Sequence, residues 1–424
     1  RYVGLDCGEG ETRYVICGAT NFAVGDLVVA ALPGAVLPGD FKIGARETYG
    51  KTSNGMICSA RELGISEDHE GIMVFTEAEV TIGEDAIQAL QINDVIFDVA
   101  VNPDRGYALS IRGIAREVAG SLGLNFKDPV EPLRTLKFEE TGKGVAAKIE
   151  EPATASVFYL RTLSDFDPSA ATPIWMRRRI EKMGMRSISL VVDITNYVML
   201  ELGQPTHAYD LDKIKGGLTV RRAKAGETLK TLDGQVRKLD LEDLLITDES
   251  GPMGLAGVMG GEDTEVTSTT QNVLVEAAHF EPITIARSAR RHRLPSEASK
   301  RYERGVDPMM ADNAAARVVQ LLEVHAGGAA DALGAEFKDL QQVPKIWLPA
   351  KFASELVGVD YTAEEIEKVL LEVGCVVASV DGGYEVIPPS WRPDLTHKTD
   401  LVEEIARIKG YERKPSRLPE APPG

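Results

Sequence analysis

Apolar residues recur at helical spacing along much of the chain, and this pattern predicts where its helices lie. A stripe of apolar residues that repeats about every 3.6 positions gives a helix one face to bury. Helices are predicted at 109–119, 174–184, 193–203, 281–292, 297–304 and 308–326. Gly203 and Pro205, at the end of one of these helices, are typical stop signals.

Strand-like runs dominate the start of the chain and recur later. Residues 13–17, 26–31 and 71–75 are short apolar runs separated by turns that contain glycine, a pattern typical of a small β-barrel. Asp233-Gly234 is a hairpin dipeptide between two further strands.

The last part of the chain mixes both patterns. Thr362 and Glu365 form a capping box that opens a helix. Strands are predicted near 374–380 and 384–388, and a final helix at 400–407.

The length of 424 residues is too great for one hydrophobic core, so several domains are expected. The patterns favour a multidomain α+β fold. Its predicted parts are a β-barrel at 1–97, a connecting strand–helix segment at 98–140, a mixed α/β domain at 141–345 and a small α/β domain at 346–418.

Composition narrows the class of protein. Charged residues make up 26% and hydrophobic residues 43%, which is typical of a soluble globular protein, and no run of about 18 apolar residues suggests a membrane span.

The four cysteines lie far apart, which argues against a zinc site and suits the reducing cytoplasm. Three of them are predicted to be core residues; the four are Cys7, Cys17, Cys58 and Cys375. The chain starts at Arg1 within strand-like sequence, so we expect a fragment that lacks its beginning.

Net charge of −18 argues against a general nucleic-acid binder. Positive charge nevertheless gathers between residues 287 and 304. This run is either a solvated helix face or a phosphate-binding patch on an acidic protein. The patch hypothesis assigns contacts with RNA phosphates to Arg290, Arg291, Arg301 and Arg304.

Scattered polar residues alternate with glycine-rich backbone between Arg186 and Asp307, as in a pocket for a small polar ligand. From the sequence alone, His207 is interpreted as a packed, hydrogen-bonded histidine. Thr195 and Asn196 are interpreted as helix-start residues. Glu276 interrupts an apolar strand, and a buried carboxylate is costly unless it is paired or given a ligand. A salt bridge to an arginine is the plain alternative.

The order and spacing of these pieces resemble the editing domain of bacterial phenylalanyl-tRNA synthetase beta subunits, and the resemblance covers nearly the whole chain. It implies an oligonucleotide-binding barrel at 1–97 and an editing domain at 141–345. It places the editing site at Arg186, Thr195, Asn196, His207, Gly257, Gly260, Glu276, Ser296 and Ala298. Ser296 departs from the threonine common in the family, which keeps the hydroxyl and removes a methyl group.

The resemblance also implies an activity. Tyrosine differs from phenylalanine by one hydroxyl, which an apolar synthetic pocket rejects poorly. The implied reaction is hydrolysis of tyrosyl-tRNA mischarged on phenylalanine tRNA, with the hydroxyl read by Glu276 and backbone N–H groups of the glycine loop. His207, Thr195 and Asn196 would position the terminal ribose and the attacking water, and Arg186 belongs to the same catalytic set.

The implied partners are phenylalanine tRNA and a separate alpha subunit in an alpha2-beta2 heterotetramer, with no membrane. The glycine-rich run 254–261 lacks a following Lys-Ser/Thr pair, so ATP use is assigned to the alpha subunit and not to this fragment.

Three acids share one face of the last helix, because Asp400, Glu403 and Glu404 stand at i, i+3 and i+4, and Asp394 lies just upstream. Acids in the first turn of a helix also interact favourably with the helix dipole, so a purely structural role is the alternative interpretation of these residues. The resemblance implies a Mg²⁺ site here, completed at the border with the alpha subunit.

Two other functions stay open. The chain could be a tRNA-binding or docking module without chemistry. It could also be a sugar- or nucleotide-handling enzyme in which Glu276 and His207 form an acid–base pair.

Overall fold

The computed structural model describes residues 1–65, 71–75, 80–138, 144–331, 335–340 and 342–414. These residues group by contacts into two compact units. The first comprises Arg1–Val99 and Thr172–Ser189, and the second comprises Ala100–Ala171 and the chain from Leu190 onward. Residues 172–189, which the sequence analysis placed in the domain 141–345, therefore group with the first unit.

The first unit is built from short antiparallel pairs. The strand pairs are β1 (Tyr2–Asp6) with β2 (Thr12–Ile16), β3 (Leu27–Val28) with β10 (Val74–Phe75), β4 (Ala30–Ala31) with β9 (Met56–Ile57), β5 (Val36–Leu37) with β6 (Phe41–Lys42), and β7 (Ala45–Thr48) with β8 (Lys51–Asn54). Its helices are α1 (Ala86–Ala89) and α3 (Ile174–Lys182). In the described residues these ladders do not join into one sheet, so the closed barrel stays a prediction.

The core of this unit joins distant parts of the chain. Val29, Ile43, Cys58 and Phe75 are buried together. Arg178 of α3 donates from Nε to the carbonyl of Leu90 at 3.2 Å.

Across both units, Cys17, Cys58 and Cys375 are buried, as predicted for three of the four cysteines, whereas Cys7 is partly exposed.

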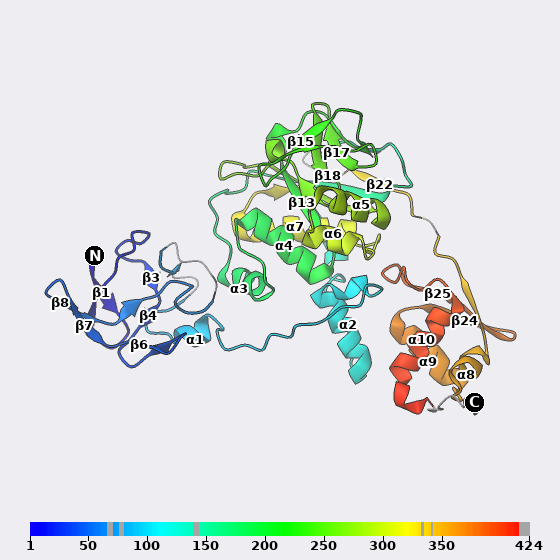
Figure 1. The fold of residues 1–424 in the computed structure, drawn as a ribbon, viewed down its shortest axis with the longest axis horizontal. Helices are drawn as coiled ribbons and strands as arrows, with labels where there is room; N and C mark the ends of the chain where they lie inside the picture. The colour runs from blue at the N-terminus through cyan, green and yellow to red at the C-terminus, as the bar shows by residue number, and fades with distance from the viewer. Residues whose placement is uncertain (66–70, 76–79, 139–143, 332–334, 341, 415–424) are drawn as a thin grey trace, which may run out of the picture. The chain divides into compact units, whose positions relative to one another are not determined.

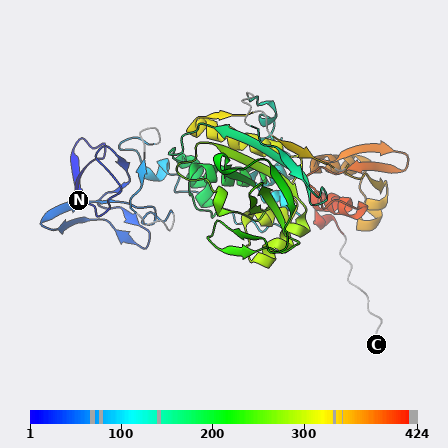
Figure 2. The same cartoon turned by 90° about the horizontal axis from the view of Figure 1, so that it is seen from above.

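Two sheets form the centre of the second unit (Figure 1). The strands of the first, in order, are β11 (Ala147–Ile149), β14 (Leu218–Arg222), β17 (Leu244–Asp248), β18 (Gly251–Leu255) and β19 (Met259–Gly260). The strands of the second are β13 (Thr206–Asp210), β20 (Val273–Phe280), β12 (Ala155–Ser164) and β21 (Ala329–Ala330), with β22 (Glu336–Lys338) also paired to β12. Figure 2 shows the long strands of the second sheet running side by side. Phe158, Leu160, Val220, Leu245 and Leu274 share one buried cluster, so the core lies between the sheets.

Helices cover the second sheet and its ends. They are α4 (Leu190–Leu202), α5 (Pro282–His292), α6 (Glu297–Tyr302) and α7 (Ala311–Ala326). α4 packs on α7 and on β13, while α7 packs on β12 and β20. The helices lie close to the predicted positions. The hairpin of β15 (Thr228–Lys230) and β16 (Val236–Lys238) confirms the turn at Asp233-Gly234.

The remaining parts of this unit are α2 (Ile111–Leu122), which Ser110 caps, and a small three-stranded domain. The small domain contains β23 (Ile346–Pro349), α8 (Phe352–Val357), α9 (Ala363–Val373), β24 (Val376–Val380), β25 (Gly383–Ile387) and α10 (Lys398–Lys409). The predicted capping box is present, because Thr362 Oγ1 accepts from the Glu365 N–H and Glu365 accepts from the Thr362 N–H. Short 3₁₀ turns connect these elements at 106–108, 133–135, 211–213, 262–264 and 411–413.

Candidate functional site

A cavity of about 80 Å³ lies where β13, β20, the β18–β19 turn and α6 meet. His207, Gly257, Gly260, Glu276 and Ala298 all line it. The structure therefore brings together residues that the sequence scatters over some ninety positions. The volume suits the end of a side chain, since an engineered cavity that holds benzene measures about 150 Å³.

Strand pairing sets the centre of the cavity. β13 and β20 run antiparallel with His207 directly opposite Glu276. Residues opposite each other on one face of such a ladder have side chains in contact range. Tyr209 lies on the same face two residues further along and meets the His207 ring edge-on, with ring centroids 4.5 Å apart.

Gly257 and Gly260 are required because aromatic side chains lie close to their backbone. A Cβ on Gly260 would stand 2.6 Å from the His207 ring, and one on Gly257 would stand 2.8 Å from the Tyr302 ring. Gly257 also has a positive φ of 65°, which side chains rarely adopt. Glycine at these positions lets the backbone form one wall of the cavity.

Glu276 is the chemically distinctive residue of the cavity. Its side chain is buried, and the Tyr209 hydroxyl donates to Oε2 at 2.5 Å. No arginine or lysine pairs with it in the described part of the chain, so the salt-bridge alternative is wrong. Burial raises the pKa of Glu276 to about 7, and the hydrogen bond from Tyr209 opposes that rise. Burial also lowers the pKa of His207 to about 4, so its imidazole is neutral at pH 7.

The other predicted site residues lie outside the cavity lining. Ser296 caps α6 and donates from Oγ to the carbonyl of Val258 at 3.1 Å, which ties the helix to the glycine turn. Thr195 on α4 donates to the carbonyl of Val192 at 2.8 Å, so its hydroxyl serves its own helix, and Asn196 follows it on α4. Arg186 belongs to the other unit, in an exposed segment after α3.

Three residues of this region were missed by the sequence analysis. Gln204 is fully buried and donates from Nε2 to the carbonyls of Pro205 and Ala278, both at 2.9 Å. The Tyr302 hydroxyl donates to the carbonyl of Ala278 at 3.2 Å. Tyr209 could have been found from strand alternation, because it is two residues beyond His207.

Comparisons with known proteins identify the family. A family described as the B3/4 domain matches residues 154–327, which include the whole cavity. A tRNA synthetase B5 domain family matches residues 346–411, and a putative tRNA binding domain family matches residues 1–85. Phenylalanine–tRNA ligase beta subunits of Leifsonia xyli and Streptomyces avermitilis are 55% and 53% identical to the chain over 98% and 100% of its length. The chain belongs to the phenylalanine–tRNA ligase beta-subunit family.

This family member spans about half the length of the curated relatives it matches, since it covers 50% of each of these two proteins and of the Thermobifida fusca beta subunit, which is 53% identical. A solved N-terminal fragment of the phenylalanyl-tRNA synthetase beta subunit from Pyrococcus horikoshii is also similar. It is 15% identical, covers 74% of the chain and 86% of its own, and has a TM-score of 0.38, which is too low to compare folds in detail.

The four arginines predicted to contact tRNA phosphates differ in their surroundings. Arg301 is 4% exposed and donates from Nε to the carbonyl of Leu109 at 3.1 Å. Arg304 donates to the carbonyl of Val101 at 3.1 Å, and Arg291 pairs with Asp243 and Glu242. The side chain of Arg290 is 77% exposed, with a distant pairing of 3.9 Å to Glu303. Three of the four arginines thus have structural partners that the sequence did not reveal.

The four acids of the predicted magnesium site have partners within the chain. Glu404 is fully buried, and it pairs with Arg105 at 2.5 Å, Arg392 at 3.1 Å and Arg407 at 2.7 Å. Burial alone would raise the pKa of Glu404, but hydrogen bonds from Arg392 and Arg407 hold it well below its ordinary value. Asp394 pairs with Arg392 at 2.7 Å.

The other two acids have partners as well. Asp400 accepts from the His397 N–H at 2.7 Å and so closes the start of its own helix. Glu403 accepts from Arg105 at 2.9 Å and from the Tyr411 hydroxyl at 2.8 Å. Within the described residues no three His, Cys, Asp or Glu side chains are placed to hold a metal ion. Each of the four acids thus has a protein partner in this chain. The magnesium site expected at a border with an alpha subunit stays a prediction.

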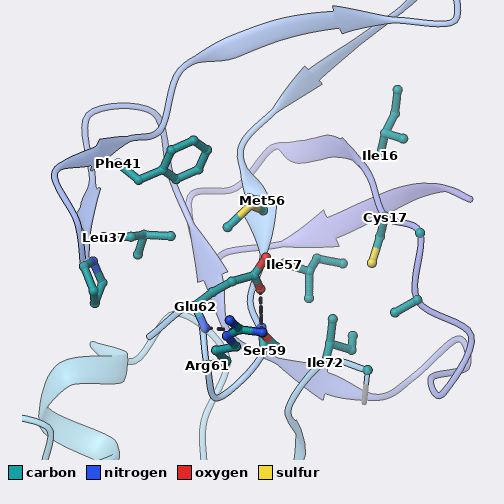
Figure 3. Close-up of a pocket in the computed structure, with 14 residues that line it drawn as sticks. Ile16, Cys17, Leu37, Phe41, Met56, Ile57, Ser59, Arg61, Glu62 and Ile72 are labelled. Atoms are coloured by element: carbon teal, nitrogen blue, oxygen red, sulfur yellow. Dashed lines mark hydrogen bonds between the residues drawn. The ribbon is translucent and has the colours of Figure 1, made fainter. Parts of the chain in front are cut away.

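A second hollow lies in the first unit, where the tRNA-binding family matches (Figure 3). It measures about 760 Å³ and is lined by apolar side chains that include Leu37, Phe41 and Met56, with Arg61 beside them. Glu62 accepts from the N–H and the hydroxyl of Ser59, at 2.7 and 2.8 Å. Proteins that bind single-stranded nucleic acid use aromatic rings for stacking and basic side chains for charge, and this hollow has one aromatic ring and one arginine.

No helix in the described ranges is long and apolar enough to cross a membrane.

Proposed function

We propose that this chain is the part of a phenylalanine–tRNA ligase beta subunit that hydrolyses tyrosyl esters of phenylalanine tRNA. The observation that carries the proposal is the buried Glu276 carboxylate, which lies in a small cavity without a cationic partner in the described residues. An unpaired buried acid is costly to fold and is kept where a ligand needs it.

The chemistry of discrimination follows from the cavity. A pocket built to hydrogen-bond a hydroxyl rejects the analogue that lacks it far better than an apolar pocket rejects an added hydroxyl. Glu276 accepts the hydroxyl of a bound tyrosyl group, and the glycine backbone lets that ring approach closely. Phenylalanine would leave Oε1 of the carboxylate without a donor.

The reaction is ester hydrolysis by water. Water attacks the ester carbonyl, the carbonyl–oxygen bond to the ribose breaks, and the ribose oxygen takes the proton as tyrosine leaves. The neutral His207 ring lies opposite Glu276. In the proposal it hydrogen-bonds the ribose or the water. Roles for Thr195, Asn196 and Arg186 in positioning the substrate are part of this proposal.

The wider assignments follow from the relatives. In the proposal the chain acts with phenylalanine tRNA and an alpha subunit in a heterotetramer, in the cytoplasm, and the alpha subunit uses ATP. Part of the tRNA contact falls in the hollow beside Phe41 and Arg61, which is supported by the tRNA-binding family match over residues 1–85. No step of the hydrolysis is assigned to Mg²⁺.

A deacylation assay with matched tyrosyl- and phenylalanyl-tRNA tests the proposal. Wild-type chain should hydrolyse the tyrosyl ester faster, and Glu276→Ala should reduce that preference by about 1–3 kcal/mol, the value of a hydrogen bond to a charged group. Glu336→Ala is a matched control, because Glu336 is exposed on β22 of the same sheet. Binding of both tRNAs without hydrolysis of either would instead support the docking-module alternative, for which the hollow of the first unit is the favouring observation.

A further inference from the structure

Tyr209 is buried to 1% exposure, yet its hydroxyl reaches the cavity. In the β13–β20 register it lies opposite Leu274, so its hydroxyl crosses the ladder diagonally to Glu276. The contact of 2.5 Å is at the short end for a hydroxyl and a carboxylate. A phenolic hydroxyl from the chain itself therefore already occupies one oxygen of the acid proposed to read a phenolic hydroxyl.

We infer that Tyr209 is a positioning residue that fixes the Glu276 carboxylate and so sets the preference of the cavity for a ligand with a phenolic hydroxyl. The inference rests on the proposed function for its meaning in catalysis. It does not depend on that function for its structural test.

Geometry gives the first part of the argument. A carboxylate has two acceptor oxygens and a freely turning end unless something holds it. Tyr209 provides the one hydrogen bond found for this carboxylate in the described part of the chain, and its ring is held in the core between the sheets. Oε2 is thus committed to the protein, which leaves Oε1 to accept from a ligand.

Charge gives the second part. The groups that face Glu276 are His207 and Tyr209 from β13 and Tyr302 from α6, and all of them are neutral at pH 7. Burial raises the pKa of Glu276 to about 7, and the Tyr209 hydrogen bond is the one opposing influence. An ionised carboxylate accepts a hydrogen bond more strongly than a protonated one. Loss of the Tyr209 hydroxyl should therefore leave Glu276 more protonated at neutral pH and a weaker reader of the ligand.

Tyr209→Phe removes the hydroxyl and keeps the ring, so it tests the inference directly. The ratio of kcat/KM for tyrosyl over phenylalanyl ester should fall roughly tenfold, as expected when a carboxylate loses a hydrogen bond. In wild type the ratio should rise with pH as Glu276 ionises near pH 7, and in the variant that rise should move to higher pH. Tyr159→Phe removes a phenolic hydroxyl from β12 of the same sheet, bonded to Arg161, and should leave both the ratio and its pH dependence unchanged.

A second measurement works without any activity. Infrared difference spectra of the full chain, with Glu276→Gln used to assign the carboxyl band, follow the titration of Glu276. The pKa of that carboxyl should be higher in Tyr209→Phe than in wild type. An equal pKa in the two proteins overturns the inference, even if wild-type chain hydrolyses the tyrosyl ester. Conversely, absence of hydrolysis by wild type refutes the proposed function, while a raised pKa in the variant still supports the positioning role.

Discussion

Two buried carboxylates of the second unit have opposite surroundings. Glu404 in the small domain is held by three arginines, whereas Glu276 in the cavity has one phenolic hydroxyl. Their pKa values accordingly move in opposite directions, down for Glu404 and up to about 7 for Glu276. The difference shows that the partners of a buried carboxylate decide its role. A carboxylate neutralised by arginines holds parts of the fold together, while one without a cation beside a cavity is available for a ligand.

The largest expected effect comes from breaking the arginine cluster. Arg392→Met should destabilise the chain by about 3–5 kcal/mol, because it leaves Asp394 and Glu404 without their main partner in a buried place. Chemical denaturation measures this. Arg413→Met is the control, since the Arg413–Glu365 pair is partly exposed and such pairs contribute about 0–1 kcal/mol. Equal losses in the two variants would remove the distinction between the buried cluster and a surface pair.

The second effect is in the pH dependence of stability. Glu276 has a folded pKa of about 7 against 4.5 in the unfolded chain, so it binds protons more tightly when folded and costs stability as pH rises from 4.5 to 7. Glu276→Gln should therefore gain about 3 kcal/mol relative to wild type across that window.

Glu404 should behave in the opposite sense. Its lowered folded pKa gives stability that is present above pH 4.5 and is lost as pH falls below it. Unfolding free energies of Glu276→Gln and wild type, measured at several pH values, separate the two contributions. A constant difference between these proteins from pH 4 to 8 would show that Glu276 does not titrate abnormally.

The smallest expected effect is a null response to magnesium. A ligand that binds the folded state raises the melting temperature, but the four acids of α10 and its approach already have partners. Millimolar Mg²⁺ and a chelator should give the same melting temperature for the isolated chain. A magnesium-dependent rise that Glu403→Gln abolishes would show that the isolated chain binds the ion at these acids.

Local patterns predicted the elements well. The helices at 281–292 and 308–326 appear as α5 and α7, because apolar spacing is a property of each helix alone. α4 begins three residues before its predicted start, since Leu190 and Val191 are buried and extend the helix. The short strands of residues 1–97 were also expected, whereas their assembly into one barrel depends on pairings between distant residues, which spacing does not encode.

The site was predicted in part for the same reason. His207 and Glu276 were chosen correctly as residues of one cavity, but their pairing across two strands is visible only in three dimensions. Tyr209 was overlooked because an aromatic residue in an apolar strand reads as core, and most of its ring is indeed core. The burial of Arg301 was not foreseen, because counting charges along the chain does not reveal the Leu109 carbonyl that accepts its hydrogen bond.

The arginine cluster also orders events during synthesis. Arg105 and Glu403 stand 298 positions apart, and closing so long a loop costs entropy that one ion pair does not repay. The ribosome releases Arg105 long before the acids of α10 exist, so its contacts with them form late in synthesis. Glu404, in contrast, emerges within twelve residues of Arg392 and is neutralised locally as the small domain forms. The bond from Arg105 is then a late link within the second unit, and it forms only once α10, which also supplies Leu401, Val402 and Ile405 to the core of the small domain, has been made.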